Sequence, residues 1–342
     1  MPVSGHAAAP LEFRSVTKQY GGAGEPAIDE LSFTVPAGEV CVLVGPSGCG
    51  KTTAMRLVNR MIELTSGDIM IDEKSIKGRN EAELRREIGY VIQQVGLFPH
   101  MTINHNITMV PRLLGWDRQR IDARAAELLE LIGLPEEMGR RYPSQLSGGQ
   151  RQRVGVARAL AADPPLMLMD EPFGAIDPIN RERLQNEFLR LQSELRKTVV
   201  FVTHDIDEAI KMGDRIAIMR QGGHLVQYDT PAHILAHPAD EFVAQFVGAD
   251  RGLKRLALTR LRDVELDATD SAHEAEANKS IPISATLRDA LSVMMSDSLR
   301  PLLVVDDGQP AGYVTIELIN RVLREGADTS GRSDTTTSVI SS

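Results

Sequence analysis

The sequence predicts an α/β fold built around a buried parallel sheet, and three observations support this prediction. Continuous apolar runs at 40–44, 166–169 and 198–202 are typical of strands that are covered on both faces. Directly after the first run comes a segment that matches the phosphate-binding pattern G-x-x-x-x-G-K-[ST], with the residues Gly45, Pro46, Ser47, Gly48, Cys49, Gly50, Lys51 and Thr52. The apolar residues that follow are at helical spacing: Met55, Val58 and Ile62. Strand, loop and helix therefore come in the order that such a loop requires.

The residue types of this loop suit the binding of nucleotide phosphates. Glycines let backbone N–H groups approach phosphate oxygens, and the start of the following helix adds partial positive charge. Lys51 is expected to reach the β- and γ-phosphates, and the hydroxyl of Thr52 to ligate Mg²⁺. The alternative is a chance glycine-rich turn, but the four fixed positions should coincide by accident only on the order of once in a hundred chains of this length.

Length and composition bound the possible functions. A chain of 342 residues, 42% of them hydrophobic, is expected to form about two globular domains. Its formal net charge of -9 argues against sequence-independent binding of nucleic acid. The only cysteines are Cys41 and Cys49, which allow neither a disulfide framework nor a metal-ligand spacing and fit a reducing cytoplasm. Because the sequence shows neither a signal peptide nor a run of about 18 apolar residues, any membrane role is expected to come through a partner.

Two candidate strands, at 11–16 and 31–35, precede the phosphate loop, and the segment 21–26 between them reads as a loop. Tyr20 stands just before that segment. Its ring can stack on a nucleotide base, but a strand-end tyrosine packed on the core is the simpler interpretation of this residue alone.

Between the first and second apolar runs the pattern becomes helical. A strand at 67–72, a charged helix at 81–87 and a strand at 89–92 are predicted, and the last of these runs into Gln93. Residues 97–162 then read as a helical insertion before the sheet resumes.

Near the end of this insertion, Leu146–Gln150 opens a helix with accessible backbone donors. Ser147 suits an N-cap position, and Gly148 and Gly149 leave the N–H groups of the helix start open to an anion. Gln150 is followed by a helical stretch rich in Arg, Ala and Leu. The pentapeptide is either a second phosphate site or an ordinary helix cap, and by itself it does not decide between them.

Polar residues follow both of the later apolar runs. Asp170 can hold Mg²⁺ through water, and Glu171 can polarise the attacking water as a general base. His204 follows the last run, at the sheet edge where α/β folds gather ligands, and is a candidate γ-phosphate sensor. The alternatives are acidic loop residues without function and a structural histidine.

The remaining chain predicts the end of one domain and a smaller second one. A hairpin and two short helices complete a first domain over residues 10–248, and 249–280 read as a partly flexible linker. A small β-α-β-β-α unit follows at 281–326, and 327–342 read as a disordered tail. A lone core of this size is marginal, so we expect the apolar face of its first helix to be buried against a copy from another subunit. This face comprises Leu287, Ala290, Leu291 and Met294.

Taken together, these motifs over residues 11–248 resemble the ATPase subunits of ABC transporters, of which Leu146–Gln150 is the most specific mark. The resemblance implies a P-loop ABC-type ATPase domain with a parallel-sheet core, an antiparallel β subdomain and a helical subdomain, followed by a small α+β unit. It implies ATP and Mg²⁺ as cofactors.

The resemblance also implies roles for individual residues. Tyr20 stacks on adenine, Thr53 belongs to the phosphate loop, and Asp177 lies in the loop between protomers. Gln93 contacts Mg²⁺ and couples the nucleotide to the membrane partner, and His204 is the switch. Ser147, Gly148, Gly149 and Gln150 contact nucleotide.

Three longer phrases, at 93–102, 171–179 and 203–211, resemble osmoprotectant importers for glycine betaine, carnitine, choline or proline. Residues 281–324 resemble a single CBS motif, a tail that ATPases of this importer class often carry. The resemblance implies a homodimer at the cytoplasmic face of the cell membrane, bound to transmembrane permease subunits and not to nucleic acid. An extracytoplasmic solute-binding protein would be an indirect partner.

Other functions remain open at this point. A soluble ABC ATPase acting on DNA or ribosomes usually carries two ATPase halves or a long coiled-coil insertion, and the sequence shows neither. A P-loop kinase would have a lid and an acceptor site in place of Leu146–Gln150. An ABC importer of another solute, such as an amino acid, would share these motifs, because specificity lies in the permease and the external binding protein.

Overall fold

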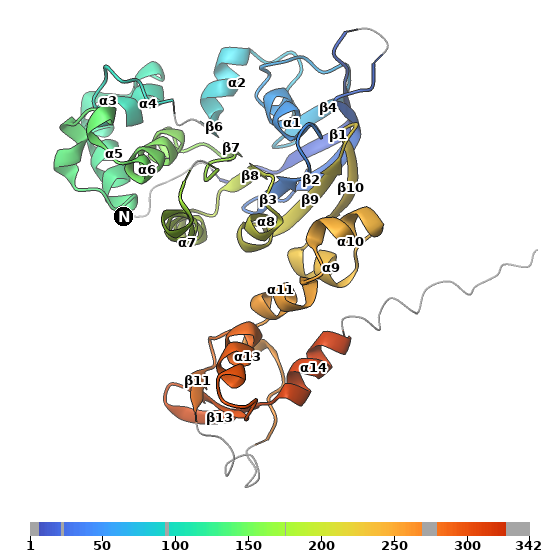
Figure 1. Ribbon diagram of the computed structural model, residues 1–342. Coiled ribbons are helices and arrows are strands. Elements are labelled where there is room, and N and C mark those ends of the chain that lie inside the picture. The colour runs from blue at the N-terminus through green and yellow to red at the C-terminus, as the bar shows by residue number, and fades with distance from the viewer. Residues whose placement is uncertain (1–6, 22–23, 93–95, 175, 269–278, 326–342) are drawn as a thin grey trace, which may run out of the picture. The chain divides into compact units, whose positions relative to one another are not determined.

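The computed structural model describes residues 7–21, 24–92, 96–174, 176–268 and 279–325. The chain divides into two compact units, residues 1–231 and 232–342, which are treated separately below (Figure 1).

The first unit is organised around a sheet in which six of the described strands pair in the order β10-β9-β3-β8-β7-β6. Neighbouring strands are parallel except β10, which runs antiparallel to β9. The strands β3 and β8 are buried along their whole length, which confirms that the continuous apolar runs are central strands. The strand bounds are β3 (Val40–Val44), β6 (Ile88–Val91), β7 (Leu166–Asp170), β8 (Thr198–Thr203), β9 (Arg215–Arg220) and β10 (His224–Asp229).

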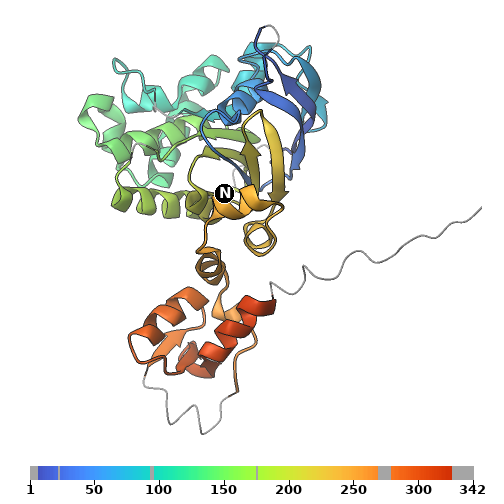
Figure 2. The ribbon, with the colours of Figure 1, turned by 45° about the vertical axis from the view of Figure 1, so that its right-hand side comes forward.

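An antiparallel sheet with the order β2-β1-β4-β5 packs beside the first. Its strands are β1 (Leu11–Lys18), β2 (Ile28–Val35), β4 (Ser66–Ile71) and β5 (Lys74–Ser75). One hydrophobic core joins this sheet to β3 and to α1 (Lys51–Val58), and in it the rings of Phe13 and Phe33 stack with centroids 4.7 Å apart. Figure 2 shows the dark-blue strands β1 and β2 beside the yellow strands β9 and β10.

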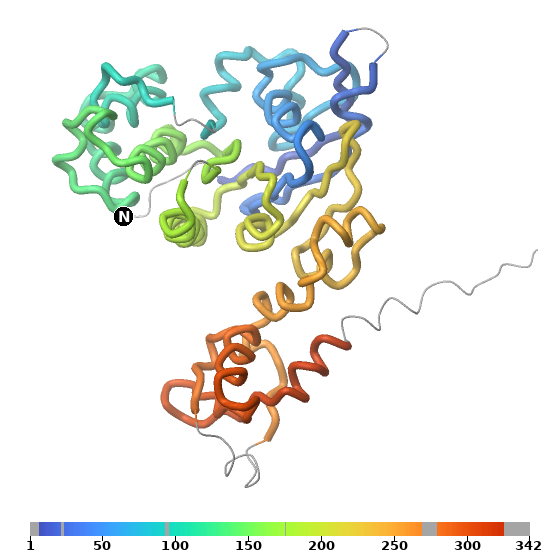
Figure 3. The backbone as a smooth tube through the Cα atoms, in the orientation of Figure 1, coloured from blue at the N-terminus to red at the C-terminus, as the bar shows by residue number. Residues whose placement is uncertain are grey.

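The segment between β6 and β7 is helical, as predicted, and Figure 3 shows it in cyan and green. The buried face of α5 carries Ile121, Ala125, Leu128 and Leu129. Arg124 ties α5 to α6, because its guanidinium donates to the carbonyl oxygens of Leu160 at 2.9 Å and Ala161 at 3.2 Å. The elements are α3 (Ile103–Ile107), α4 (Met109–Leu113), α5 (Arg118–Leu131), η1 (Glu136–Arg140), η2 (Pro143–Gln145) and α6 (Gly148–Leu160).

Three further helices complete the first unit: α2 (Glu81–Glu87), α7 (Pro178–Leu195) and α8 (Ile206–Met212). Asp205 caps α8 by accepting hydrogen bonds from the backbone N–H groups of Asp207 and Glu208. Over the part of the chain that the structure describes, no helix is long and apolar enough to cross a membrane.

In the second unit, a three-stranded sheet with the order β11-β12-β13 is packed by helices. The predicted β-α-β-β-α order is present, with the short strand β11 as its first strand. The elements here are α9 (Pro231–Ala236), α10 (Glu241–Val247), α11 (Arg251–Leu258), η3 (Leu261–Asp263), β11 (Ser280–Pro282), α13 (Leu287–Met295), β12 (Leu302–Asp306), β13 (Gln309–Val314) and α14 (Ile316–Glu325). The predicted boundary near Gly248 differs from the division at residue 231, because α10 and all but the first residue of α9 group with the second unit.

Part of the predicted linker belongs to the core of this unit. Leu256 on α11 and Leu261 on η3 are buried in the same cluster as the strands and helices of the small α+β unit. The segment resembles a linker in sequence because α11 is short and buries only one residue, Leu256. The predicted disordered tail at 327–342 lies outside the described residues.

The expectation that α13 buries its apolar face only against a second copy is wrong. Leu287, Ala290 and Met294 are fully buried within the unit itself, and Leu291 is partly buried there. The partners are α11 and α14, and α11 lies outside the segment to which the sequence pattern limited the unit. The hydrophobic core of the unit is therefore larger than residues 281–326 alone would form, because residues N-terminal to this segment contribute to it.

Candidate nucleotide-binding site

The segment Gly45–Gly50 forms a tight loop between β3 and α1, in the predicted strand–loop–helix arrangement. Two of its glycines are required by close packing. A Cβ on Gly45 would lie 2.1 Å from the carbonyl oxygen of Met219, and one on Gly50, where φ is +98°, would lie 2.4 Å from that of Ala27. Along the loop, Pro46 is half-buried, Ser47 and Gly48 are exposed and Cys49 is buried. The exposed part of the loop is therefore the part that can meet a ligand.

Lys51, the first residue of α1, is buried and folds back over the loop. Its Nζ donates to the carbonyl oxygens of Gly45 at 2.7 Å and Pro46 at 3.0 Å. The ammonium group is therefore held at the mouth of the loop, where the pattern predicts phosphate oxygens. Thr53 follows in the first turn of the same helix.

Thr52 and Asp170 meet from opposite parts of the chain. The Thr52 hydroxyl donates to Asp170 Oδ1 at 3.3 Å, which joins the start of α1 to the end of β7. Burial raises the pKa of Asp170 above its usual range, although the hydrogen bond from Thr52 opposes the shift. A hydroxyl and a carboxylate at this spacing are the oxygen donors that Mg²⁺ prefers, so the pair fits the ion.

Glu171 and His204 form a second pair beside the first. His204 Nδ1 lies 3.2 Å from Glu171 Oε1, so the residues that follow β7 and β8 are in hydrogen-bond contact. Glu171 has a φ of +43°, unusual for a residue other than glycine, and its N–H donates to the Val202 carbonyl oxygen at 3.0 Å. The contacts on both its backbone and its side chain hold this carboxylate in place.

The segment Ser147–Gln150 forms a capped helix start, as the sequence predicts. Ser147 Oγ accepts from the Gln150 N–H at 3.3 Å, and Gln150 Oε1 accepts from the Ser147 N–H at 2.9 Å. Gly148 is exposed and Gly149 is half-buried. The start of α6 is therefore rigid and still reachable from solvent.

Asp177 lies next to this helix start. Together with Ser147, Gly148, Gly149 and Gln150 it lines a hollow of about 350 Å³. Asp177 caps α7, and hydrogen bonds from Asn180 hold the pKa of its carboxyl below the usual range.

The sequence prediction did not include Asn180 and Arg153, which also line this hollow. The amide of Asn180 donates to Asp177 Oδ2 at 2.8 Å, and Arg153 Nη1 donates to the Ile132 carbonyl oxygen at 2.9 Å. The only signal for them is helical spacing: Asn180 follows Asp177 by one turn, and Arg153 follows Gly149 by one turn.

Two predicted residues stand apart from these clusters. Tyr20 follows β1 and is 53% exposed, with Lys18 Nζ 5.1 Å from its ring centroid, so it is not packed on the core. Its ring is accessible to a base. Gln93 lies outside the described residues.

A family model described as "ABC transporter" matches residues 28–174. The osmoprotectant import ATP-binding protein OsmV of Salmonella typhimurium is 52% identical over 309 residues, covering 89% of this chain and 78% of that protein. The carnitine transport ATP-binding protein OpuCA of Listeria monocytogenes is 50% identical over 312 residues, covering 91% of this chain and 76% of that protein. The choline transport ATP-binding protein OpuBA of Bacillus subtilis is 48% identical over 312 residues, covering 91% of this chain and 80% of that protein.

Solved structures are similar over the ATPase part. A dimeric ATP-binding cassette, MJ0796, bound to ADP and Pi in a post-hydrolysis state, is 34% identical with a TM-score of 0.57, covering 65% of this chain and 98% of that one. The protein cbiO1 of Clostridium perfringens, part of an ABC transporter complex, is 26% identical with a TM-score of 0.61. The match covers 67% of this chain and 91% of that one. The chain belongs to the ATP-binding proteins of ABC transporters, in the group that contains the osmoprotectant, carnitine and choline import proteins.

Proposed function

We propose that two copies of this chain bind two ATP molecules head to tail. The start of α6 in one copy, at Ser147–Gly149, would face the γ-phosphate held by Lys51 of the other. The support is that each chain has two helix starts suited to phosphate, at α1 and α6, which a single bound ATP does not need. Asp177 and the hollow beside α6 would lie at the same interface. Tyr20 would stack on adenine from its exposed position.

Within each site, we assign hydrolysis to the Glu171–His204 pair. Glu171 would accept the proton of the attacking water as the general base, and His204 would orient that carboxylate through the 3.2 Å contact and sense the γ-phosphate. Thr52 and Asp170 would hold Mg²⁺, with Gln93 as a further ligand. The ion supplies charge stabilisation at the phosphates when it is bound.

The hydrolysis would drive solute import through a permease. We infer that the chain docks on transmembrane permease subunits at the cytoplasmic face of the membrane, and that an extracytoplasmic binding protein delivers the solute. The solute class would be osmoprotectants: glycine betaine, carnitine, choline or proline. The observation that carries this proposal is the identity of 48 to 52% with osmoprotectant, carnitine and choline import proteins over about nine-tenths of the chain.

This proposal predicts ATP-dependent uptake by the complete transporter. The chain, its permease and the binding protein would be reconstituted in proteoliposomes and offered labelled glycine betaine, carnitine, choline and a neutral amino acid. We expect uptake of at least one quaternary amine and none of the amino acid. Uptake of the amino acid alone would contradict the solute class, and capture of ribosomal proteins instead of permease subunits from a detergent extract would contradict the transport role.

A second prediction concerns the coupling surface around Phe98. Phe98 is 38% exposed, whereas its backbone is fixed by the side-chain amide of buried Asn106. The amide oxygen accepts from the Phe98 N–H at 2.7 Å, and the amide nitrogen donates to the Phe98 carbonyl oxygen at 3.1 Å. An apolar ring presented on a fixed segment is typical of a partner surface. Gln93, which the sequence places at the same surface, is predicted to contribute to it.

We therefore expect Phe98→Asp to abolish transport in proteoliposomes while the isolated subunit keeps its ATPase activity. Phe98→Leu, which keeps an apolar side chain, should retain most of the uptake. Parallel loss of both activities in Phe98→Asp would show that the ring serves core packing instead.

A further inference from the structure

We propose that buried Glu208 is a positioning residue for ATP hydrolysis. It would tie the start of α8, and with it His204, to helix α7, which Asp177 caps. The inference deepens the proposed function and rests on it, because that function assigns His204 to the reaction. Glu208 would act through its neighbours and not by contact with ATP.

Glu208 is a buried carboxylate that the assignments above leave unused. It lies on α8 with 8% of its surface exposed, and burial raises the pKa of its carboxyl above the usual range. Hydrogen bonds with the side chains of Thr203 and Gln185 oppose that shift, as does the positive charge of Arg181. Acidic side chains are almost never buried unless they are paired, because the loss of water costs free energy. The contacts of Glu208 therefore offset this cost.

The first group of contacts comes from α7. Gln185 is also buried, and its Nε2 donates to Glu208 Oε1 at 2.9 Å. Arg181 lies one turn before Gln185 on the same helix, and its Nη2 donates to the Ile176 carbonyl oxygen at 3.0 Å. Ile176 directly precedes Asp177. Side chains of α7 therefore connect Glu208 to the loop that carries Asp177.

The second group of contacts surrounds His204. Thr203 ends β8, and its Oγ accepts from the Asp205 N–H at 3.1 Å, so this hydrogen bond spans His204. Asp205 Oδ1 in turn accepts from the Glu208 N–H at 3.2 Å. Both chain neighbours of His204 are thus linked to Glu208. Because His204 Nδ1 lies 3.2 Å from Glu171 Oε1, a shift at Glu208 would reach the general base.

These contacts form a chain from Asp177 to His204. They join the loop that would face the second copy to the histidine that would sense the γ-phosphate. A misplacement of about 1 Å in a reacting geometry can cost about 10²-fold in rate. Loss of the Glu208 carboxylate is therefore expected to slow hydrolysis. ATP binding should persist, because Lys51 and the phosphate loop belong to other elements.

Replacement of Glu208 by glutamine in the full chain tests this inference. We expect kcat for ATP hydrolysis to fall about tenfold or more while KM stays within about twofold. Glu208→Leu, which fills a similar volume without a polar group, should lose at least as much of kcat. Thermal unfolding would establish that each variant is folded at the assay temperature. A role in stability alone would not separate kcat from KM in this way.

An exchanged pair provides the discriminating arm. Glu208→Gln combined with Gln185→Glu restores one carboxylate and one amide across the same contact, with the carboxylate now one turn from Arg181. We expect kcat of this double variant to recover to within about threefold of the unaltered chain. Gln185→Glu alone places two carboxylates against each other and should lose about tenfold or more of kcat. Should Glu208→Gln alone not fold, the rate of the exchanged pair still decides the question.

Nuclear magnetic resonance of the histidine side chains reports the surroundings of His204 directly. The chain would be prepared with isotope-labelled histidine, and the signal of His204 identified by its loss in His204→Ala. We expect this signal to move in Glu208→Gln and to return toward its original position in the exchanged pair.

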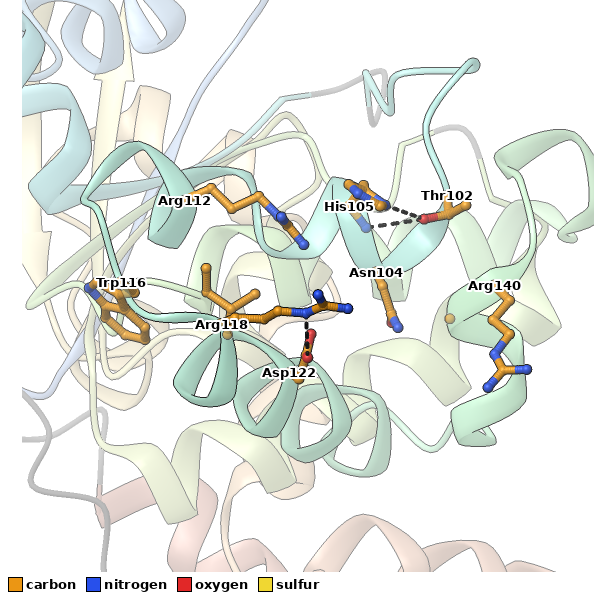
Figure 4. Close-up of a pocket in the computed structure, with 10 residues that line it drawn as sticks. Thr102, Asn104, His105, Arg112, Trp116, Arg118, Asp122 and Arg140 are labelled. Atoms are coloured by element: carbon orange, nitrogen blue, oxygen red, sulfur yellow. Dashed lines mark hydrogen bonds and ion pairs between the residues drawn. The ribbon is translucent and has the colours of Figure 1, made fainter.

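The matched control is Asp122→Asn, which removes an exposed carboxylate from another ion pair of the first unit. Figure 4 shows Asp122 beside Arg118, with the two side chains 3.7 Å apart, in a hollow that none of the nucleotide-site residues lines. This variant should keep kcat within about twofold and leave the His204 signal in place.

The outcomes separate this inference from the proposed function. Unchanged kcat in both Glu208→Gln and Glu208→Leu would overturn the positioning role, as would a folded exchanged pair that shows no recovery. Equal loss of kcat and of ATP affinity would also overturn it. Hydrolysis at the unaltered rate by His204→Ala would instead contradict the role that the proposed function gives to His204.

Discussion

Replacement of Glu171 by glutamine is expected to lower the ATP hydrolysis rate by about 10²- to 10⁴-fold while ATP binding persists. The side chain keeps its shape and can still contact His204, whose Nδ1 is 3.2 Å from Glu171 Oε1, but it can no longer accept a proton from water. Phosphate release under steady-state conditions measures the loss. Because hydrolysis would normally separate the two copies, the variant should also accumulate as an ATP-bound dimer, which size-exclusion chromatography with ATP and Mg²⁺ would detect.

The matched control for this variant is Glu182→Gln, a change of the same chemistry at an exposed position on α7. It should hydrolyse ATP at the rate of the unaltered chain. Elution of Glu171→Gln only as a monomer would contradict the head-to-tail dimer, and hydrolysis at the unaltered rate would remove Glu171 from the role of general base.

Replacement of Lys51 by alanine is expected to weaken ATP binding by about 10- to 100-fold, since a hydrogen bond to a charged group contributes about 1.5 to 3 kcal/mol. Two effects add. The ammonium group that faces the phosphates is lost, and the carbonyl oxygens of Gly45 and Pro46, at 2.7 and 3.0 Å from Nζ, lose their donor. Titration with a fluorescent ATP analogue measures the dissociation constant.

Lys77→Ala, a change at an exposed lysine of the same unit, is the control for removal of a positive charge. Circular dichroism of both variants would establish that each remains folded. An unchanged dissociation constant for Lys51→Ala would remove the phosphate-contact role of this residue.

The central architecture could be predicted from the sequence because the signals are local. A strand covered on both faces must be apolar throughout, and β3 and β8 carry that signal in adjacent residues. Element ends were less predictable. The helix after the phosphate loop stops at Val58 rather than reaching Ile62, because Asn59 serves as its C-cap and Arg60 has a φ of +46°. The strand β11 gives only a weak local signal, because it has three residues, of which Ile281 alone is buried.

The pairing of site residues could be predicted only in outline. The sequence places Asp170 and His204 after buried strands, and the carboxyl ends of parallel strands share one sheet edge. The contacts themselves depend on the fold, since Thr52 and Asp170 are separated by 118 residues and Glu171 and His204 by 33.

The packing of α11 also limits where such a protein can exchange modules with a relative. Leu256 and Leu261 belong to the hydrophobic core of the C-terminal unit, although they precede residues 281–324, the segment that resembles a CBS motif. A recombination junction between residues 256 and 261 would place Leu256 from one parent in a core whose other residues come from the second parent. Side chains that did not evolve together would then pack with gaps or clashes. Fusions that join ahead of Arg251 keep this interior together, so natural or engineered tail swaps that succeed are expected to cross over on that side.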